Sequence, residues 1–150
     1  MKLAEALIKR ADLKAQIAQI VTRMKENAKV QEGDTPAEDV VELGRMYESM
    51  MEALETLILR INRTNAASTL GDESLADAIA RRDCLKAKIA AYRAVRETSL
   101  AKERRFSRSE IKDVRTVDIA KLQRIIDDCS RQYRELDTKI QGCNWMTALL

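Results

Sequence analysis

LADAIARRDCLKAKIA, at residues 75–90, nearly repeats LAEALIKRADLKAQIA, at residues 3–18. Nine of the sixteen positions are identical at a constant offset of 72 residues. In both copies the seam positions alternate in steps of three and four when Arg10 and Arg82 are counted with the apolar residues, the pattern of a helix that packs along one coiled-coil-like seam. The same amphipathic helix is therefore predicted twice, once at residues 3–18 and again at residues 75–90.

A second helical pattern is also repeated, at an offset of 79 residues. Its first copy places apolar residues in unbroken steps of three and four at Val40, Leu43, Tyr47, Met50, Leu54, Leu57 and Ile61. Its second copy has Ile119, Leu122, Ile126, Cys129, Tyr133, Leu136 and Ile140. The pattern predicts two copies of one α-hairpin, residues 1–71 and 72–150. Because the offset grows from 72 to 79, the second copy is longer, mostly within residues 96–118.

Local signals suggest where helices start and where they are interrupted. TPAE at residues 35–38 combines an N-cap threonine, a proline at the first helical position and a glutamate three residues after the cap, which predicts a helix start there. Residues 74–77 form a similar signal before the repeated helix. Short extended segments are expected in the hairpin connections, at residues 29–32 and 111–117.

The composition indicates an all-α protein. The 150 residues are 45% apolar, 3% aromatic and 34% charged, with one proline and four glycines, which is typical of long helices. A chain of this length fits one domain, and two hairpins can form an antiparallel four-helix bundle. Residues 40–61 have more apolar surface than one partner helix covers, owing to Met46, Met51, Ile58 and Leu59. The hairpins could pack within one chain or across subunits, and self-association into a dimer or larger assembly is expected.

Arg10 and Arg82 occupy the same position in the repeated seam. An arginine there pairs with a carboxylate or extends to water along its aliphatic stem, and it can set the register of the helices. The alternative is an anion site in a shared polar layer. Acidic partners could come from Glu52 or Glu55 for the first arginine, and from Glu135 or Asp137 for the second.

The longer connection contains KERRFSRSEIKDVR at residues 102–115, with six basic and three acidic residues. Its candidate partner-binding residues are Arg104, Arg105, Phe106, Arg108 and Lys112. A single aromatic among interspersed acids is a poor stacking platform for single-stranded nucleic acid, and a solvated charged loop is the alternative reading. Trp145, the only tryptophan, is expected to pack against the bundle or at a subunit contact.

Several classes of function are disfavoured. The chain has no histidine, and its three cysteines form no CxxC pair, which argues against a zinc site and a disulfide framework. No nucleophile–base pair or phosphate-binding glycine loop is recognisable, so we expect no enzyme, no cofactor and no small-molecule substrate. The net charge of +3 is too weakly focused for a typical nucleic-acid binder. Without an export signal or a long apolar run, a cytoplasmic location is expected.

The chain resembles a septicolysin-like family of small bacterial proteins over essentially its whole length. The resemblance rests on KLAEALIKRADL, NAKVQEGDTPAEDV, INRTNAAS, FSRSEIKDVRTVD and NW, which occur in this order. It implies a membrane-active, cytolysin-like protein as one alternative, and it carries no catalytic residues. The residues themselves favour a non-catalytic structural or interaction module, and an RNA-binding helical arm is a third hypothesis.

Overall fold

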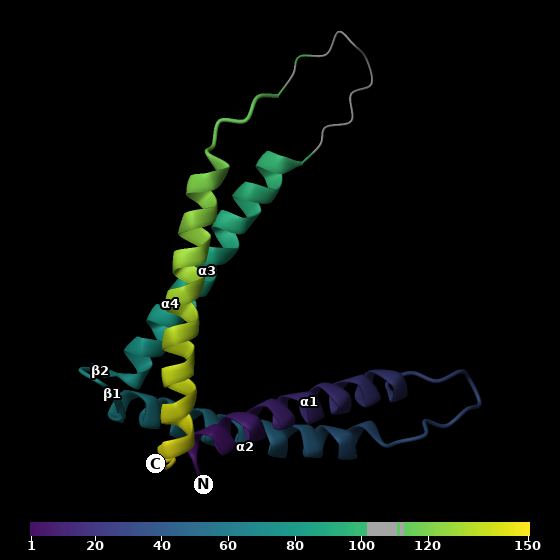
Figure 1. Ribbon diagram of the computed structural model, residues 1–150. Helices are drawn as coiled ribbons and strands as arrows, with labels where there is room; N and C mark the ends of the chain where they lie inside the picture. The colour runs from purple at the N-terminus through teal and green to yellow at the C-terminus, as the bar shows by residue number, and fades with distance from the viewer. Residues whose placement is uncertain (102–110, 112) are drawn as a thin grey trace. The chain divides into compact units, whose positions relative to one another are not determined.

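The computed structural model describes residues 1–101, 111 and 113–150, and it is all-α (Figure 1). Its helices are α1 (Leu3–Asn27), α2 (Val40–Ala67), α3 (Leu75–Leu100) and α4 (Ile119–Met146). The described residues also include two very short strands, β1 (Thr69–Leu70) and β2 (Glu73–Ser74), paired antiparallel. The predicted all-α fold, built from two α-hairpins, is confirmed.

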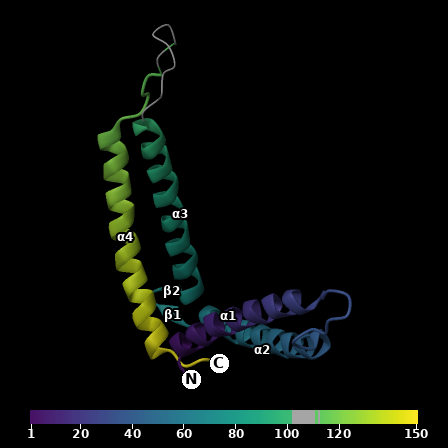
Figure 2. The same cartoon turned by 90° about the vertical axis from the view of Figure 1, so that its right-hand side faces the viewer.

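Each hairpin consists of two helices that lie side by side, α1 with α2 and α3 with α4 (Figure 2). The predicted seams are the packed faces, and several equivalent positions are buried in both repeats. Leu43, Leu57 and Ile61 of α2 are buried, as are their counterparts Leu122, Leu136 and Ile140 of α4. In the second hairpin, Ile89, Ile126 and Cys129 form a cluster against which Tyr92 and Tyr133 pack. The duplication is therefore confirmed in the core as well as in the sequence.

The first hairpin connection differs from its prediction. The helix does not begin at residues 35–38 but at Val40, whose cap is Asp39: the Asp39 carboxylate accepts a hydrogen bond from the Val41 amide at 2.8 Å. The Glu38 carboxylate instead binds the guanidinium of Arg23, with Nε at 2.9 Å. A forked arginine–carboxylate pair is stronger than a single capping bond, so Glu38 is held by α1 rather than by a capping box.

The short strands also lie elsewhere than expected. None of the described residues in either hairpin connection forms a strand. The two strands instead join α2 to α3, with Thr69 opposite Ser74 and Leu70 opposite Glu73. Gly71 occupies the turn between them with a φ of 67°, a conformation that glycine adopts without steric cost. The extended segments therefore connect the two repeats instead of closing each hairpin.

The chain forms two compact units, residues 1–76 with 141–150 and residues 77–140. The first unit contains two equivalent backbone junctions. The amide of Leu75 donates to the carbonyl of Ser68 at 2.8 Å, and the amide of Leu3 donates to the carbonyl of Thr147 at 2.9 Å. Leu3 and Leu75 are equivalent at the offset of 72, and Ser68 and Thr147 are equivalent at the offset of 79, so the two hydrogen bonds join the same positions of the repeats. Each repeat's first helix thus begins against the residue that follows the second helix of the other repeat.

The two chain ends are joined by further hydrogen bonds at this junction. Lys2 and Ala148 form an isolated β-bridge, and the amide of Leu149 donates to the carbonyl of Met1 at 3.0 Å. The amide of Leu150 donates to the buried Thr64 hydroxyl at 3.0 Å. Figure 1 accordingly shows the N- and C-terminal ends side by side. The ends of the chain are therefore part of the folded structure.

This equivalence predicts that a circular permutant will fold. In this permutant a short flexible linker joins Leu150 to Met1, and the chain is opened between Gly71 and Asp72. The junction at Leu3 and Thr147 then lies within a continuous chain, and the junction at Leu75 and Ser68 lies at the new chain ends. We expect far-UV circular dichroism to show unchanged helix content and thermal melting to stay cooperative. A permutant opened between Glu55 and Thr56, inside α2, serves as the control that should lose both. Equal loss in the two permutants would contradict the equivalence.

The Arg23–Glu38 pair predicts a pH effect. The hydrogen bond from Arg23 lowers the pKa of Glu38 below its ordinary value of 4.5. A carboxyl whose pKa is lower in the folded state stabilises the fold above pH 4.5, and this contribution is lost as the pH falls through the lowered value. In an NMR titration, Arg23→Met should return the pKa of Glu38 toward 4.5. The control Arg45→Met should leave it unchanged, and an unaltered midpoint in Arg23→Met would refute the pairing.

Candidate functional site

Arg82 is held by two carboxylates. Its side chain is 22% exposed, and its Nη1 lies 3.2 Å from Asp137 Oδ1. Its Nη2 and Nε donate to Asp83 Oδ1 at 2.8 and 3.0 Å. Burial lowers the pKa of Arg82, but the hydrogen bonds that it donates to Asp83 and Asp137, together with their negative charges, outweigh burial and raise the pKa above its ordinary value. Glu135 was the other predicted acidic partner of Arg82, but its Oε1 lies 3.5 Å from Nη1 of Arg131 instead.

Arg10 lies in a different setting. It is half-buried and has no hydrogen-bond or ion-pair partner within residues 1–101, 111 and 113–150. Glu55 is exposed and is likewise unpaired in that part of the chain. The structure therefore does not join Arg10 to Glu55, and the two equivalent arginines have different surroundings despite their identical place in the repeat.

The remaining predicted site residues fall into two groups. Arg104, Arg105, Phe106, Arg108 and Lys112 lie outside the described residues. Trp145 is 54% exposed, so the expected packing of this side chain against the helices is not observed. The reason lies in the helix geometry: the buried side of α4 passes through Ile140 and Asn144, and Trp145 projects about 100° further round the helix. Its predicted role at a subunit contact stays a prediction.

An open groove of about 380 Å³ runs along one side of the seam between α3 and α4. Its residues on α3 are spaced at i, i+3, i+4 and i+7, and those on α4 at i, i+3 and i+4, so each helix contributes one face. They are Lys86, Ile89, Ala90, Arg93, Ser130, Tyr133 and Arg134. Three cations thus border an apolar floor, and no acidic residue lines the groove.

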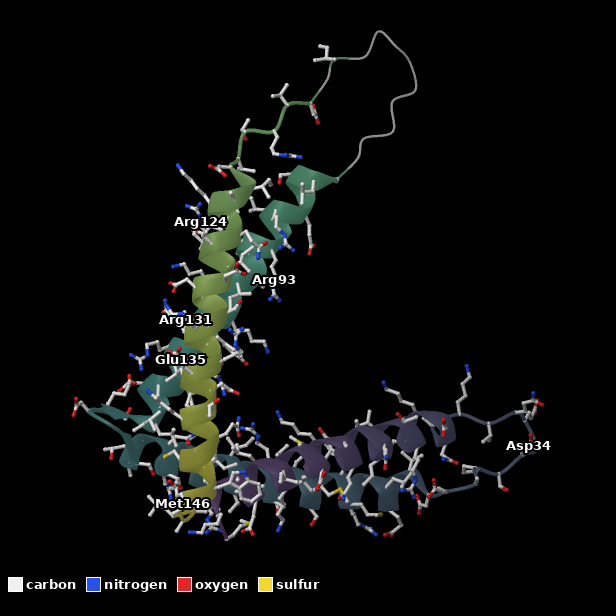
Figure 3. All side chains as sticks on the ribbon, in the orientation of Figure 1. Asp34, Arg93, Arg124, Arg131, Glu135 and Met146 are labelled. Carbon is white, nitrogen blue, oxygen red and sulfur yellow. The ribbon has the colours of Figure 1, made fainter. Side chains whose placement is uncertain are left out.

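The three cations of this basic groove are free to bind a partner. The charged side chains of Lys86, Arg93 and Arg134 have no hydrogen-bond or ion-pair partner among the residues that the structure describes. Figure 3 shows Arg93 on α3, and Arg124 and Arg131 on α4. The Ser130 hydroxyl oxygen in the groove wall is buried and has no hydrogen-bond partner within residues 1–101, 111 and 113–150. The groove therefore combines unneutralised positive charge with apolar surface.

The first hairpin has a different surface at the equivalent positions. Val21 replaces Arg93 at the offset of 72, while Met51 and Glu55 replace Ser130 and Arg134 at the offset of 79. A second open groove, about 270 Å³ in volume, lies near this side of the hairpin. It is lined by Val21, Met24, Lys25, Ala28, Val40 and Tyr47. Lys14 stands where the second hairpin has Lys86, so this side of the first hairpin keeps one of the three cations but has an apolar and an acidic residue in place of Arg93 and Arg134.

The apolar side of α2 continues beyond this groove. A line of residues within about 60° of one another on the helix surface extends along α2, and we call it the α2 stripe. It consists of Val40, Gly44, Tyr47, Met51 and Ile58. Each of them is at least partly exposed, and Met51 is 37% exposed. On α4 the last two positions are Ser130 and Asp137, so the part of the stripe formed by Met51 and Ile58 belongs to the first repeat alone.

Two further properties concern metals and membranes. Within the described ranges, no three His, Cys, Asp or Glu side chains gather closely enough to hold a metal ion. Over the same residues, no helix combines the length and the apolar character that crossing a bilayer requires. Cys84, Cys129 and Cys143 are free thiols.

Sequence reasoning identified the arginines in the seam but missed the cations of the groove. Lys86, Arg93 and Arg134 resemble ordinary surface residues when each helix is considered alone. For two of them the available signal was the comparison of the repeats, because Arg134 stands where the first repeat has Glu55 and Arg93 stands where it has Val21, whereas Lys86 has the counterpart Lys14. Positions at which two copies of one scaffold differ in charge were therefore the better guide to the surface.

The carboxylates near Arg82 allow a direct test. Asp137→Ala leaves a largely buried guanidinium with one carboxylate fewer, so we expect it to lower the free energy of unfolding by about 1 kcal/mol. Urea denaturation measures this change. The matched control is Glu135→Ala, which removes an exposed partner of Arg131 and should cost under about 0.5 kcal/mol. Equal effects of the two substitutions would show that Asp137 does not hold Arg82.

Comparison with known proteins identifies relatives. Residues 10–149 match the model of DUF6847, a family of unknown function. A solved structure described as a functionally unknown conserved protein from Corynebacterium diphtheriae has a TM-score of 0.89 and 37% sequence identity. The similarity covers 100% of this chain and 99% of that one. No curated protein matches the chain. Because the family model spans nearly the whole sequence, the protein belongs to the family of unknown function DUF6847.

Proposed function

We propose that this protein is a non-catalytic interaction module whose function depends on self-association into a homodimer. The observation that carries the proposal is the α2 stripe, because its apolar side chains lie partly in solvent. A contiguous exposed apolar surface bordered by charged residues is typical of protein interaction sites. Met51 lies at the centre of the stripe, between the exposed carboxylates of Glu48 and Glu55.

The comparison of the two repeats supports an interaction role for the stripe. Met51 and Ile58 have polar counterparts on α4, where Ser130 and Asp137 occupy the same places in a hairpin of the same design. Apolar residues at these positions are therefore not needed to form the hairpin. An apolar helix face wider than one partner covers is expected to contact a further helix.

The chemistry of the described surfaces supports a role in binding. The two grooves are lined by aliphatic, aromatic and cationic side chains, with a single hydroxyl group, that of Ser130, outside the tyrosines. The chain contains no histidine, the side chain that most often serves in general acid–base catalysis at neutral pH. These side chains suit contact with another protein surface, and a two-fold dimer is the simplest closed assembly of identical chains.

Sedimentation velocity over a range of protein concentrations tests the proposal. We expect a species of twice the 17.0 kDa chain mass, which dissociates on dilution. Met51→Glu should shift this equilibrium to the monomer, because it places a charge at the centre of the apolar stripe. The matched control is Met46→Glu on the opposite side of the α2 seam, where Met46 is 45% exposed, and it should leave the dimer intact. A wild-type protein that stays monomeric at every concentration would refute the proposal.

A further inference from the structure

We propose that the segment Glu48–Glu55 of α2 docks in the basic groove of a second copy, where its carboxylates pair with Lys86, Arg93 and Arg134. This inference rests on the proposed self-association and specifies the two surfaces that meet. Met51 then contacts the apolar floor formed by Ile89 and Tyr133. The contact joins the first hairpin of one copy to the second hairpin of the other.

Unpaired charge on both surfaces supports this pairing. The groove holds three cations without partners among the described residues, and no acidic residue lines it. On α2, Glu48 and Glu55 are exposed and also have no ion-pair or hydrogen-bond partner in the described part of the chain. Opposite charges that border complementary apolar surfaces select partner and register, because wrong pairings bring like charges together.

The spacing of the residues also agrees. Glu48, Met51 and Glu55 follow one another at intervals of three and four residues. Lys86, Ile89 and Arg93 have the same two intervals, and all three line the groove. Seven residues of helix span about 10.5 Å, so the outer charges are equally far apart on both helices. An acid–apolar–acid row can therefore lie against a base–apolar–base row with both charges matched.

The repeat explains why the pairing joins unlike hairpins. At the equivalent positions Glu55 and Arg134 the two hairpins carry opposite charges, and Val21 replaces Arg93 in the first hairpin. Contact between two first hairpins would bring carboxylates together, and contact between two second hairpins would bring cations together. Each copy carries one acidic segment and one basic groove, so the same contact occurs twice in a dimer with a two-fold axis.

Charge reversal with mixing tests the inference. The acid-reversed variant carries Glu48→Lys and Glu55→Lys, and the base-reversed variant carries Lys86→Glu and Arg93→Glu. Alone, each variant should dimerise at least about tenfold more weakly than the wild type in sedimentation velocity, because like charges then face each other. An equimolar mixture of the two should recover the dimer, since both contacts of the mixed dimer again pair opposite charges.

The control is a variant with Lys121→Glu and Arg124→Glu, two exposed cations of α4 outside the groove. It has the same net charge as the base-reversed variant and should dimerise like the wild type. Far-UV circular dichroism verifies that every variant is folded. If a reversed variant does not fold, Lys86→Gln with Arg93→Gln replaces it, and this variant should weaken the dimer and reduce its sensitivity to salt.

The outcomes separate this inference from the proposed function. Recovery in the mixture supports docking between copies. A dimer that persists in both reversed variants leaves self-association intact but overturns the docking. Failure of the folded variants to recover in the mixture also overturns it, because contacts within one chain or with another class of ligand would not be restored between chains. A wild-type protein that is always monomeric refutes both proposals.

Discussion

Two backbone hydrogen bonds, from Leu3 to Thr147 and from Leu75 to Ser68, determine how the repeats are connected. The first amides of a helix have no partner within the helix, and both leucines are fully buried, so water cannot satisfy these amides. The carbonyl that satisfies each one comes from the residue after the second helix of the other repeat. Neither repeat can therefore complete its own first helix, which gives the duplication a structural reason.

The duplicated scaffold separates residues that build the hairpins from residues that distinguish them. Leu43, Ile61 and their counterparts Leu122 and Ile140 are buried in both repeats, because removing them from water provides the stabilisation of a helix pair. The sides of the hairpins have no such requirement and have diverged into an apolar, acidic surface around Met51 and a basic groove. A contact between unlike hairpins requires such a difference, because the two surfaces that meet must carry opposite charges.

The seam arginines show how identical positions can acquire different roles. Arg82 is held by Asp83 and Asp137, whereas Arg10 has no such partner among the described residues. The position equivalent to Asp137 in the first repeat is Ile58, a member of the α2 stripe. Ala11 likewise stands where the second repeat has Asp83, so both carboxylates that hold Arg82 are absent from the first repeat, and Ile58 also extends the apolar surface of α2.

The helices, their pairing into two hairpins and the longer second connection could be predicted from the sequence. Apolar periodicity is a property of neighbouring residues, and a repeat of 72 to 79 residues is visible without coordinates. The position of Arg82 in the seam was found in the same way. The basic groove was not, because its charges come from two helices, and only Arg93 and Arg134 stand out when the repeats are compared.

The sequence by itself determined where apolar faces form and that they occur twice. The tertiary structure decided which polar groups meet: Arg23 binds Glu38, Asp39 caps α2 at Val40, and Asp137 holds Arg82 while Glu135 does not. It also decided that Trp145 is exposed and that Leu3 pairs with Thr147. The physical reason is that burial follows a local period, whereas a hydrogen bond or ion pair depends on two groups that folding brings within about 3 Å.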